Sequence, residues 1–357
     1  MLHLLDPENQ PQLRQWLAEK GHPAFRFAQI RKWLFEGRVM SFEEMTDLPK
    51  KLREGLAADF QIWTSKIAKH QKSQDGTGTE KLLLELADGG RIECVLLRDG
   101  DRRSICISSQ VGCAMGCVFC ASGLDGVDRN LTAGEIIEQM LVLSRLLPPE
   151  ERLSHIVVMG MGEPLANVDK LLLALGEASS ETGLAISPRR ITISTVGLPP
   201  AMDKLSRLES KYHLAVSLHA PNDALRNRIV PVNKNIGVDK ILEAADRYFE
   251  ASGRRLTFEY VLLANLNDSD QDAQELVQLL RGRTALLNVI PYNPVAGLPY
   301  ETPSANRINR FRDILMLGGV NVKFRQRRGS DINAACGQLR RKAAAEGQVP
   351  VVQISPK

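Results

Sequence analysis

Three cysteines, Cys113, Cys117 and Cys120, stand close together in the segment SSQVGCAMGCVFCASG. Thiolates are soft ligands, and this spacing is typical of iron–sulfur clusters or zinc sites. Closed sites of both kinds normally take four protein ligands. No further cysteine or histidine follows until His155, so the motif predicts a [4Fe–4S] cluster with one iron left open. A zinc site completed by a distant residue is the alternative.

The open iron indicates the chemistry. Such an iron can hold the amino and carboxylate groups of S-adenosylmethionine (SAM) and, by electron donation, cleave its sulfonium bond to give a 5′-deoxyadenosyl radical. Phe119 precedes the last cysteine, and the motif follows the first strand of a strand–helix series. Both features match the radical-SAM superfamily signature, which predicts SAM as a second cofactor.

The elements that would position this motif form an alternating pattern. Short β-branched runs predict strands at 104–109, 155–160, 190–195, 213–218, 256–262, 285–291 and 321–325. Helical periodicity predicts helices at 132–147, 167–180, 198–208, 238–251, 269–281 and 304–317. Alternation of this kind predicts right-handed crossovers and a parallel sheet, in a complete or partial barrel. In such barrels the working residues follow the strand ends.

The N-terminal part of the chain differs from the rest. Residues 1–68 carry apolar side chains at helical spacing, and Asp88-Gly89-Gly90 lies between two apolar runs, as in a β-hairpin. We expect a helical accessory domain at 1–68, to which the family resemblance described below assigns RNA binding, a hairpin linker at 69–103, a barrel with a C-terminal cysteine loop at 104–345, and a tail at 346–357. Two basic stretches with aromatic residues, FRFAQIRKWLFEGR and KFRQRRG, suit phosphate contacts, although solvated faces are the alternative.

Composition limits the class of protein. The 357 residues are 43% hydrophobic and 25% charged, as in a globular protein, and no apolar run is long enough to span a bilayer. The start, MLHLLDPENQ, does not resemble a signal peptide, so we expect a cytoplasmic protein without membrane contact. Six cysteines are too few for a disulfide scaffold, which favours ligation in a reducing compartment.

Polar residues follow the predicted strands, where a bound SAM would lie. The glycines of MGMGEP permit close backbone approach, and Glu163 could accept a hydrogen bond from the SAM ammonium. Ser194 ends one strand, Ser217-Leu218-His219 ends the next, and Asn293 in IPYNP could read the adenine edge. Each of these residues taken alone would more often be a satisfied turn residue.

Two more cysteines suggest covalent chemistry. Cys336 lies in the Gly-containing loop SDINAACGQL, and Cys106 lies on the first strand before the cluster motif. One thiol can carry a group and the other can resolve the adduct as a disulfide, whereas Cys94 is expected to be a buried hydrophobe. Glu93, a polar residue in an apolar hairpin strand, either faces solvent or projects into the site as an acid or base.

Together these residues resemble the radical-SAM RNA adenine methyltransferases, the RlmN/Cfr family. The resemblance covers nearly the whole chain and includes CISSQVGCAMGCVFC, MGMGEPLAN, SPRRITISTVG, AVSLHAPND, IPYNP and INAACGQL. It implies an α/β fold, namely a partial (β/α)6 radical-SAM barrel with an N-terminal helical accessory domain and a connecting β-hairpin.

The resemblance also implies roles for individual residues. Cys113, Cys117 and Cys120 would hold the cluster, Cys336 would accept a methyl group, Cys106 would form a transient disulfide with it, and Glu93 would accept a proton. The implied SAM contacts are Gly162, Glu163, Ser194, Ser217, Leu218, His219 and Asn293.

The implied reaction is radical methylation of adenine C2 in 23S ribosomal RNA near the peptidyl transferase centre, and of the adenosine 3′ of the anticodon in transfer RNA. Two SAM molecules are used per turnover: one methylates Cys336, and the other yields the radical that removes hydrogen from the S-methyl group. A monomer served by a low-potential electron donor such as flavodoxin is expected. Methylation at C8 by the same mechanism is the main alternative; other radical-SAM substrates and a zinc-stabilised RNA-binding protein are the remaining ones.

Overall fold

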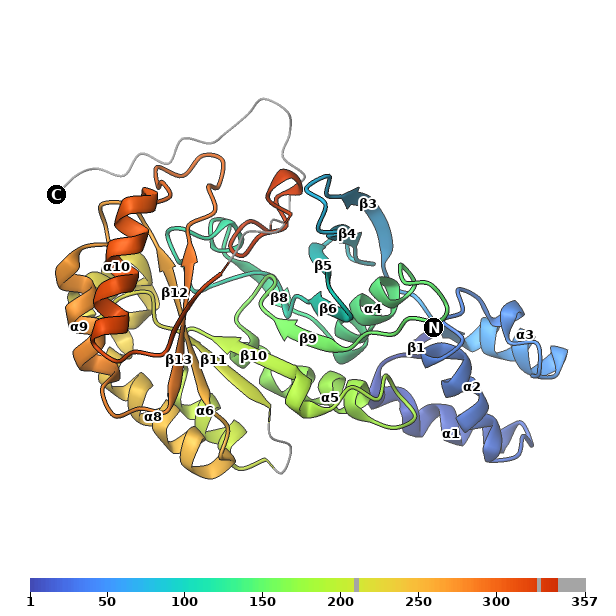
Figure 1. Cartoon of the computed structure of the whole chain (residues 1–357). Coiled ribbons are helices and arrows are strands. Elements are labelled where there is room, and N and C mark those ends of the chain that lie inside the picture. Colours follow the sequence, from blue (N-terminus) through green and yellow to red (C-terminus); the bar gives the residue numbers. More distant parts are fainter. Residues whose placement is uncertain (209–211, 326–328, 340–357) are drawn as a thin grey trace.

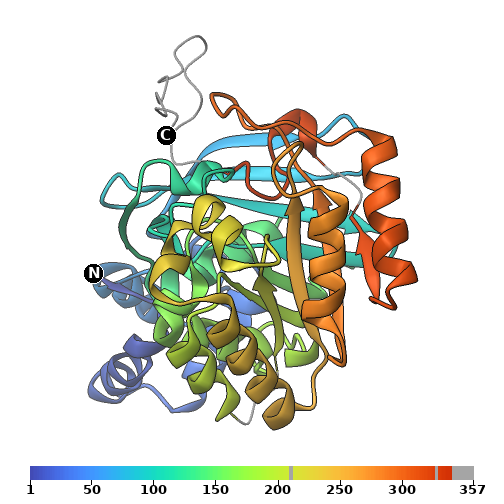
Figure 2. The ribbon, with the colours of Figure 1, turned by 90° about the vertical axis from the view of Figure 1, so that its left-hand side faces the viewer.

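The computed structural model describes residues 1–208, 212–325 and 329–339. Its main feature is a curved sheet in which seven strands run parallel in chain order (Figures 1 and 2). These strands are β6 (Arg102–Cys106), β9 (His155–Val158), β10 (Ile191–Thr195), β11 (His213–Ser217), β12 (Leu256–Leu262), β13 (Ala285–Pro291) and β14 (Val322–Phe324). Six of them agree with the predicted strands to within two residues, and β6 ends three residues before its predicted end, so the partial barrel is confirmed.

Helices cover the outer face of the sheet (Figures 1 and 2). They are α4 (Ala133–Ser144), α5 (Val168–Ser179), α6 (Pro199–Ser206), α7 (Asp223–Ile229), α8 (Val238–Ser252), α9 (Asp270–Leu280) and α10 (Ala305–Leu317). All but α7 match predicted helices. Short 3₁₀ turns occupy Pro7–Asn9, Phe42–Glu44, Ala121–Gly123, Pro164–Asn167, Pro188–Arg190, Pro231–Asn235 and Ser330–Ile332. No helix in the described ranges is long and apolar enough to span a bilayer.

The expected hairpin linker continues the barrel sheet. β4 (Glu80–Glu85) and β5 (Arg91–Asp99) pair antiparallel around the turn at Gly89, whose φ of 83° suits glycine. β5 pairs with β6 of the barrel, and β3 (Lys66–Lys72) adds an outer strand to β4. The hairpin therefore has a fixed position relative to the barrel strands. β3 starts at Lys66, within the segment 1–68 that was expected to be helical. The strand was not predicted, because its exposed and mostly polar residues show no alternating pattern.

The N-terminal segment folds into three helices, as predicted. α1 (Gln10–Glu19), α2 (Phe25–Phe35) and α3 (Lys50–Asp59) bury one apolar face each. A small parallel pair, β1 (Leu2–His3) with β2 (Phe60–Gln61), joins the two ends of this segment. The domain boundaries themselves stay a prediction, and the expected tail at 346–357 lies outside the described residues.

A buried carboxylate fastens this N-terminal segment to the barrel. Glu138 of α4 is fully buried and accepts hydrogen bonds from the backbone N–H and hydroxyl groups of Thr64 and Ser65. The Nε2 atom of His3 lies 3.1 Å from Glu138 Oε1. These partners hold the pKa of Glu138 low despite its burial. Arg31 of α2 adds an ion pair of 2.6 Å with Glu177 of α5.

The barrel is not closed by strand pairing. In the described chain β14 forms one edge of the sheet and β3 the other. The loop 329–339 leaves the β14 edge and lies beside the turn between β3 and β4, as the red and blue segments at the top of Figure 1 show. This loop carries Cys336 across the seam between the two edges. A separate two-stranded ribbon, β7 (Gln110–Gly112) with β8 (Val127–Asn130), frames the cluster motif.

The Glu138 contacts predict a large loss of stability on truncation. Glu138→Ala leaves four partly buried donors without this acceptor, so the free energy of unfolding should fall by about 3 kcal/mol. Urea unfolding together with limited proteolysis of the N-terminal segment would measure this. Glu8→Ala is the matched control, because Glu8 also bridges to the barrel, through Lys170, but is half exposed. Equal stability of both variants would contradict the assigned role of Glu138.

Candidate active site

The three motif cysteines lie on one loop at the C-terminal end of the barrel strands. The loop follows β7, and Cys113 N donates to Gly126 O at 2.8 Å, where the chain turns into β8. Val118 N donates to Ile229 O at 3.1 Å, which ties the loop to the end of α7. Gly116 has a φ of 67°, so the tight turn between the first two cysteines needs a residue that tolerates this region.

The electrostatics of these thiols fit a cationic cluster. Burial raises the pKa of Cys113 to about 12 and, with the charges of its neighbours, that of Cys117 well above its usual value. The pKa of Cys120 is also raised, mainly by burial. Thiolates so close together need a positive group to stabilise them, which iron supplies. Among the described residues no three potential ligands surround a single metal-ion position; a [4Fe–4S] cluster takes each thiolate on a different iron, so wider separation suits it.

His219 and Phe119 form an aromatic wall beside the cluster loop. Their rings pack edge to face with centroids 4.9 Å apart. His219 adopts a φ of 60°, and its Nδ1 atom accepts a hydrogen bond from Val261 N at 3.1 Å. Burial, with a smaller contribution from Arg226, lowers the pKa of His219 to about 3. The imidazole is therefore neutral and can only offer Nε2–H as a donor.

The MGMGEP turn follows β9 and lies against β7 without room for side chains. Gly162 has a φ of 101°, and a Cβ atom there would lie 2.6 Å from the side chain of Gln110. The Gln110 side chain accepts from Glu163 N at 2.8 Å and donates to Asn130 at 2.7 Å. The glycines thus allow the turn to approach the neighbouring strand, as the sequence predicted.

Glu163 is more constrained than the sequence indicated. Its buried carboxylate accepts from Leu165 N at 3.0 Å and from Val196 N at 2.9 Å. Burial raises its pKa, and these hydrogen bonds oppose the rise. Glu163 therefore joins its own turn to the end of β10. A carboxylate has further lone pairs, so a SAM ammonium remains an additional partner that the chemistry permits.

Ser194 and Ser217 point toward each other from β10 and β11, with their Oγ atoms 3.5 Å apart. Leu218 is fully buried.

Arg226 of α7 is a fully buried guanidinium next to the ends of β10 and β11. It donates to the carbonyls of Ser217 and Leu218, both at 2.9 Å, and to that of Val196. Burial lowers the pKa of Arg226 to about 10, while the charge of Cys117 opposes this. Arg226 thus fixes the backbone of two strand ends where SAM contacts are expected.

Asn293 presents an unused acceptor. Its side chain is buried, its Nδ2 donates to Cys336 O at 3.2 Å, and its Oδ1 has no hydrogen-bond partner within the described residues. A buried amide oxygen without a donor is costly. The amino group of an adenine would satisfy it, so this orphaned atom fits the predicted SAM adenine or a substrate base.

The two remaining thiols of interest, Cys106 and Cys336, lie near enough for their charges to interact. Cys106, at the end of β6, is buried, which raises its pKa to about 12; the neighbouring Cys336 adds to the rise, and Arg325 opposes it. Both cysteines are free thiols. Arg325 also interacts with Glu259, whose pKa burial raises to about 7. Arg325 was expected to contact phosphate, but it lies against these buried groups; Arg327 and Arg328 lie outside the described residues.

Glu93 does not face solvent. It is buried on β5, and its Oε1 lies 2.8 Å from Nζ of Lys81 on β4. Val95, two residues along β5, is paired with Cys106. Because side chains alternate along a strand, Glu93 and Cys106 lie on the same face of the sheet. Cys94 is fully buried in the core, as expected for a small hydrophobe.

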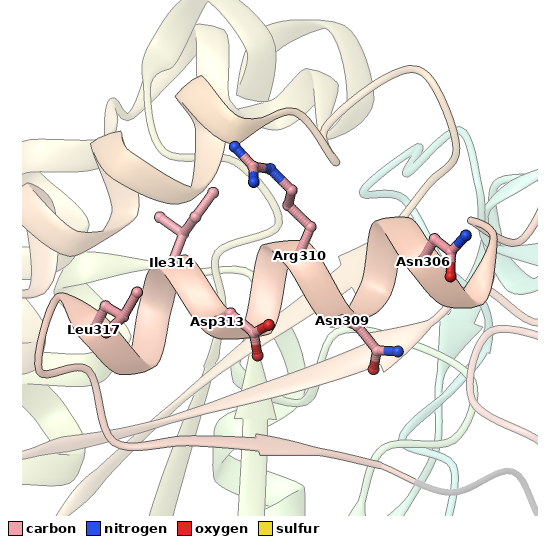
Figure 3. Close-up of a pocket in the computed structure, with 6 residues that line it drawn as sticks. All are labelled: Asn306, Asn309, Arg310, Asp313, Ile314 and Leu317. Atoms are coloured by element: carbon pink, nitrogen blue, oxygen red, sulfur yellow. The ribbon is translucent and has the colours of Figure 1, made fainter.

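A hollow elsewhere on the surface is not the site. It runs along the outside of α10, where Figure 3 shows its lining residues. These are Asn306, Asn309, Arg310, Asp313, Ile314 and Leu317. None is a predicted site residue, and Arg310 is already paired with Asp270 at 2.7 Å.

Comparison with known proteins places this geometry in a family. The radical SAM superfamily model matches residues 107–278, and the model of the ribosomal RNA large subunit methyltransferase N-terminal domain matches residues 3–62. A probable dual-specificity RNA methyltransferase RlmN of Rhodopirellula baltica is 68% identical over 92% of this chain and 88% of its own. The chain belongs to the RlmN family. A second such relative, from Symbiobacterium thermophilum, is 44% identical over 92% of this chain and 88% of its own.

A solved structure supports the same assignment. The radical SAM methyltransferase of Sphaerobacter thermophilus is 43% identical, with a TM-score of 0.92 over 96% of this chain and all of that one. This RlmN-family protein is therefore a radical SAM methyltransferase that uses a [4Fe–4S] cluster and SAM.

Sequence reasoning missed four residues of this RlmN-family site, namely Lys81, Arg226, Glu259 and Asn288. Lys81 lies in an apolar run of the expected hairpin, and Arg226 lies in a segment for which no helix was predicted, so neither was singled out. For Glu259, its place inside the apolar run LTFEYVL was the available signal. Its carboxylate accepts from Asn288 at 2.7 Å on the neighbouring strand.

Arg226 predicts a specific loss of stability. Arg226→Met leaves the buried carbonyls of β10 and β11 without donors, and the free energy of unfolding should fall by about 3 kcal/mol. Arg226→Lys should recover part of it, because a charged donor remains. Denaturant unfolding measures both, with Arg228→Met as a control, since Arg228 lies exposed on the same helix. A loss no larger than that of the control would show that the carbonyl contacts do not matter.

Proposed function

We propose that this protein methylates C2 of adenine in 23S ribosomal RNA, and of the adenosine 3′ of the anticodon in transfer RNA, through an S-methyl group on Cys336. One observation carries the proposal: outside the cluster loop there is a second pair of free thiols, Cys106 and Cys336, near enough for their charges to interact. The curated relatives are described as dual-specificity RNA methyltransferases, which supports two kinds of RNA substrate.

One set of residues binds the cluster and SAM, and a second set takes part in the reaction. Cys113, Cys117 and Cys120 hold the cluster, and the strand-end residues Gly162, Glu163, Ser194, Ser217, Leu218, His219 and Asn293 bind SAM. When bound, the cluster and two SAM molecules supply a methyl group and a 5′-deoxyadenosyl radical. The neutral His219 would add no positive charge to a site that is to hold the cationic SAM.

Cys336, Cys106 and Glu93 carry the carbon to the base. C2 of adenine is electron-poor and does not attack a methyl cation equivalent, so the methyl group first goes to the Cys336 sulfur. After loss of a hydrogen atom, the methylene carbon on Cys336 adds to C2 as a radical. Glu93 accepts the ring proton, and the adduct gives up one electron, for which the oxidised cluster would be the acceptor. Cys106 then attacks the Cys336 sulfur; the carbon–sulfur bond breaks, the released carbon takes up a proton to complete the methyl group, and a disulfide remains. Reductant then restores both thiols.

The RNA must present an unstacked base to the barrel mouth, at a cost of a few kcal/mol. The N-terminal segment, including the basic helix α2, would offset this cost through contacts to phosphate. We further propose that the protein acts as a monomer in the cytoplasm, with a low-potential electron donor such as flavodoxin.

Nucleoside analysis tests the site of methylation. Ribosomal and transfer RNA treated with the reconstituted enzyme should contain 2-methyladenosine when digested and compared by mass spectrometry with 2-methyl and 8-methyl standards. The C2 position is favoured by the relatives' description as RlmN rather than by any single residue. The 8-methyl product alone would replace this proposal with its alternative.

Replacement of Cys336 and replacement of Cys106 should stop the reaction at different steps. Cys336→Ala should abolish methylation because no methyl carrier remains. Cys106→Ala should leave RNA attached covalently to Cys336, because nothing attacks that sulfur. Gel electrophoresis of labelled RNA under denaturing conditions detects the adduct.

The buried Cys94 provides the control, since Cys94→Ala should allow normal turnover. Full turnover by either the Cys106 or the Cys336 variant would contradict the two-thiol route.

A further inference from the structure

Lys81 is a buried lysine at the edge of the proposed site. Only 5% of it is exposed, and a lysine is rarely buried unless its charge is paired. Its Nζ lies 2.8 Å from Glu93 Oε1 and donates to the carbonyl of Asn333 at 3.1 Å. One ammonium therefore contacts both the proposed proton acceptor and the loop that carries Cys336.

The strand register explains how Lys81 reaches both partners. Leu83 pairs with Glu93, and Lys81 pairs with Val95, so Lys81 and Glu93 are diagonal neighbours on one face of the hairpin. Long side chains span this diagonal. Val95 is in turn opposite Cys106, which brings the resolving thiol onto the same face.

The turn before Lys81 also holds the cysteine loop. Ser73 Oγ and Gln74 N donate to the carboxylate of Asp331, at 2.5 and 2.7 Å. In the opposite direction, Gly329 N donates to Asp75 at 2.7 Å. These contacts join the β3 edge of the sheet to the loop that leaves the β14 edge. The two chain segments lie side by side at the top of Figure 1. The contacts do not involve Lys81, so the loop keeps its place if Lys81 is changed.

We propose that Lys81 is a positioning residue for methyl transfer, whose ammonium holds the Glu93 carboxylate ionised and fixed relative to the Cys336 loop. The inference rests on the proposed role of Glu93 as proton acceptor. In that step the C2–H bond of the adduct breaks, its electron pair stays in the adduct, and the proton passes to the Glu93 carboxylate. Lys81 keeps its own protons throughout.

Charge is the property that Lys81 contributes. Loss of the Lys81 ammonium removes a cationic partner of the buried Glu93 carboxylate and so favours its protonated form. A protonated Glu93 cannot accept the ring proton. The first half of the reaction, methylation of the Cys336 thiol, does not use Glu93 and should not depend on Lys81.

The test compares Lys81→Met with Lys81→Arg in the reconstituted enzyme. Lys81→Met should form 2-methyladenosine about 100-fold more slowly under single-turnover conditions, the size of a lost acid–base step, with an unchanged KM for RNA. Peptide mass spectrometry should still find S-methylated Cys336. Lys81→Arg should restore most of the rate because it keeps the charge. Lys66→Met is the matched control, since Lys66 forms an exposed ion pair with Glu85 on the same hairpin.

A double-mutant cycle with Glu93→Gln separates the possible failures. If Lys81 acts through Glu93, Lys81→Met should cost little more in the Glu93→Gln background. Fully additive losses, or a Lys81→Met rate like that of wild type, would overturn the inference. Normal turnover by Glu93→Gln alone would instead refute the proposed role of Glu93. If Lys81→Met does not fold, Lys81→Gln carries the same test, because it removes the charge but keeps a donor for Asn333.

Discussion

The pairing of β5 with β6 is the constraint on which the rest of the site depends. It sets Val95 opposite Cys106 and makes the N-terminal hairpin part of the barrel sheet. A shift of one residue would turn Glu93 away from the face that carries Cys106. The pairing of β4 with β5 in the same sheet also fixes Lys81, which lies opposite Val95 and therefore on the face that carries Glu93. One ladder of backbone hydrogen bonds thus determines which titratable side chains meet at the barrel mouth.

The site divides into two halves with different electrostatics. The cluster half contains thiols whose ionisation burial opposes, together with one buried guanidinium, Arg226, that binds carbonyl groups. The other half contains Cys106, Cys336, Glu93 and Glu259, with Lys81 and Arg325 as counter-charges. Asn293 donates to the backbone of Cys336, and its Oδ1 has no partner within the described residues.

Much of the fold and the chemistry could be predicted from the sequence, for identifiable reasons. The barrel strands are short β-branched runs between amphipathic helices, so periodicity located them closely. The cluster cysteines lie within one loop, so local spacing was enough. Cys106 and Cys336 lie far apart in the chain, and residue types alone could only permit their pairing. The family resemblance supplied this pairing, which stays a prediction; in the structure the two thiols are near enough for their charges to interact.

The residues that sequence reasoning missed have a common physical property. Lys81, Arg226 and Glu259 are charged groups buried by partners distant in the chain, and their strand or helix reads as ordinary until those partners are known. Burial of a charge is unfavourable unless other groups compensate it, so such a residue persists where its contacts serve more than packing. Lys81 illustrates this, because a hydrophobic residue would fill the same space between β5 and the cysteine loop. It could not bind a carboxylate and a carbonyl at once. Methyl transfer from Cys336 to the base, with Glu93 as proton acceptor, requires that these two separate segments of the chain keep their relative positions.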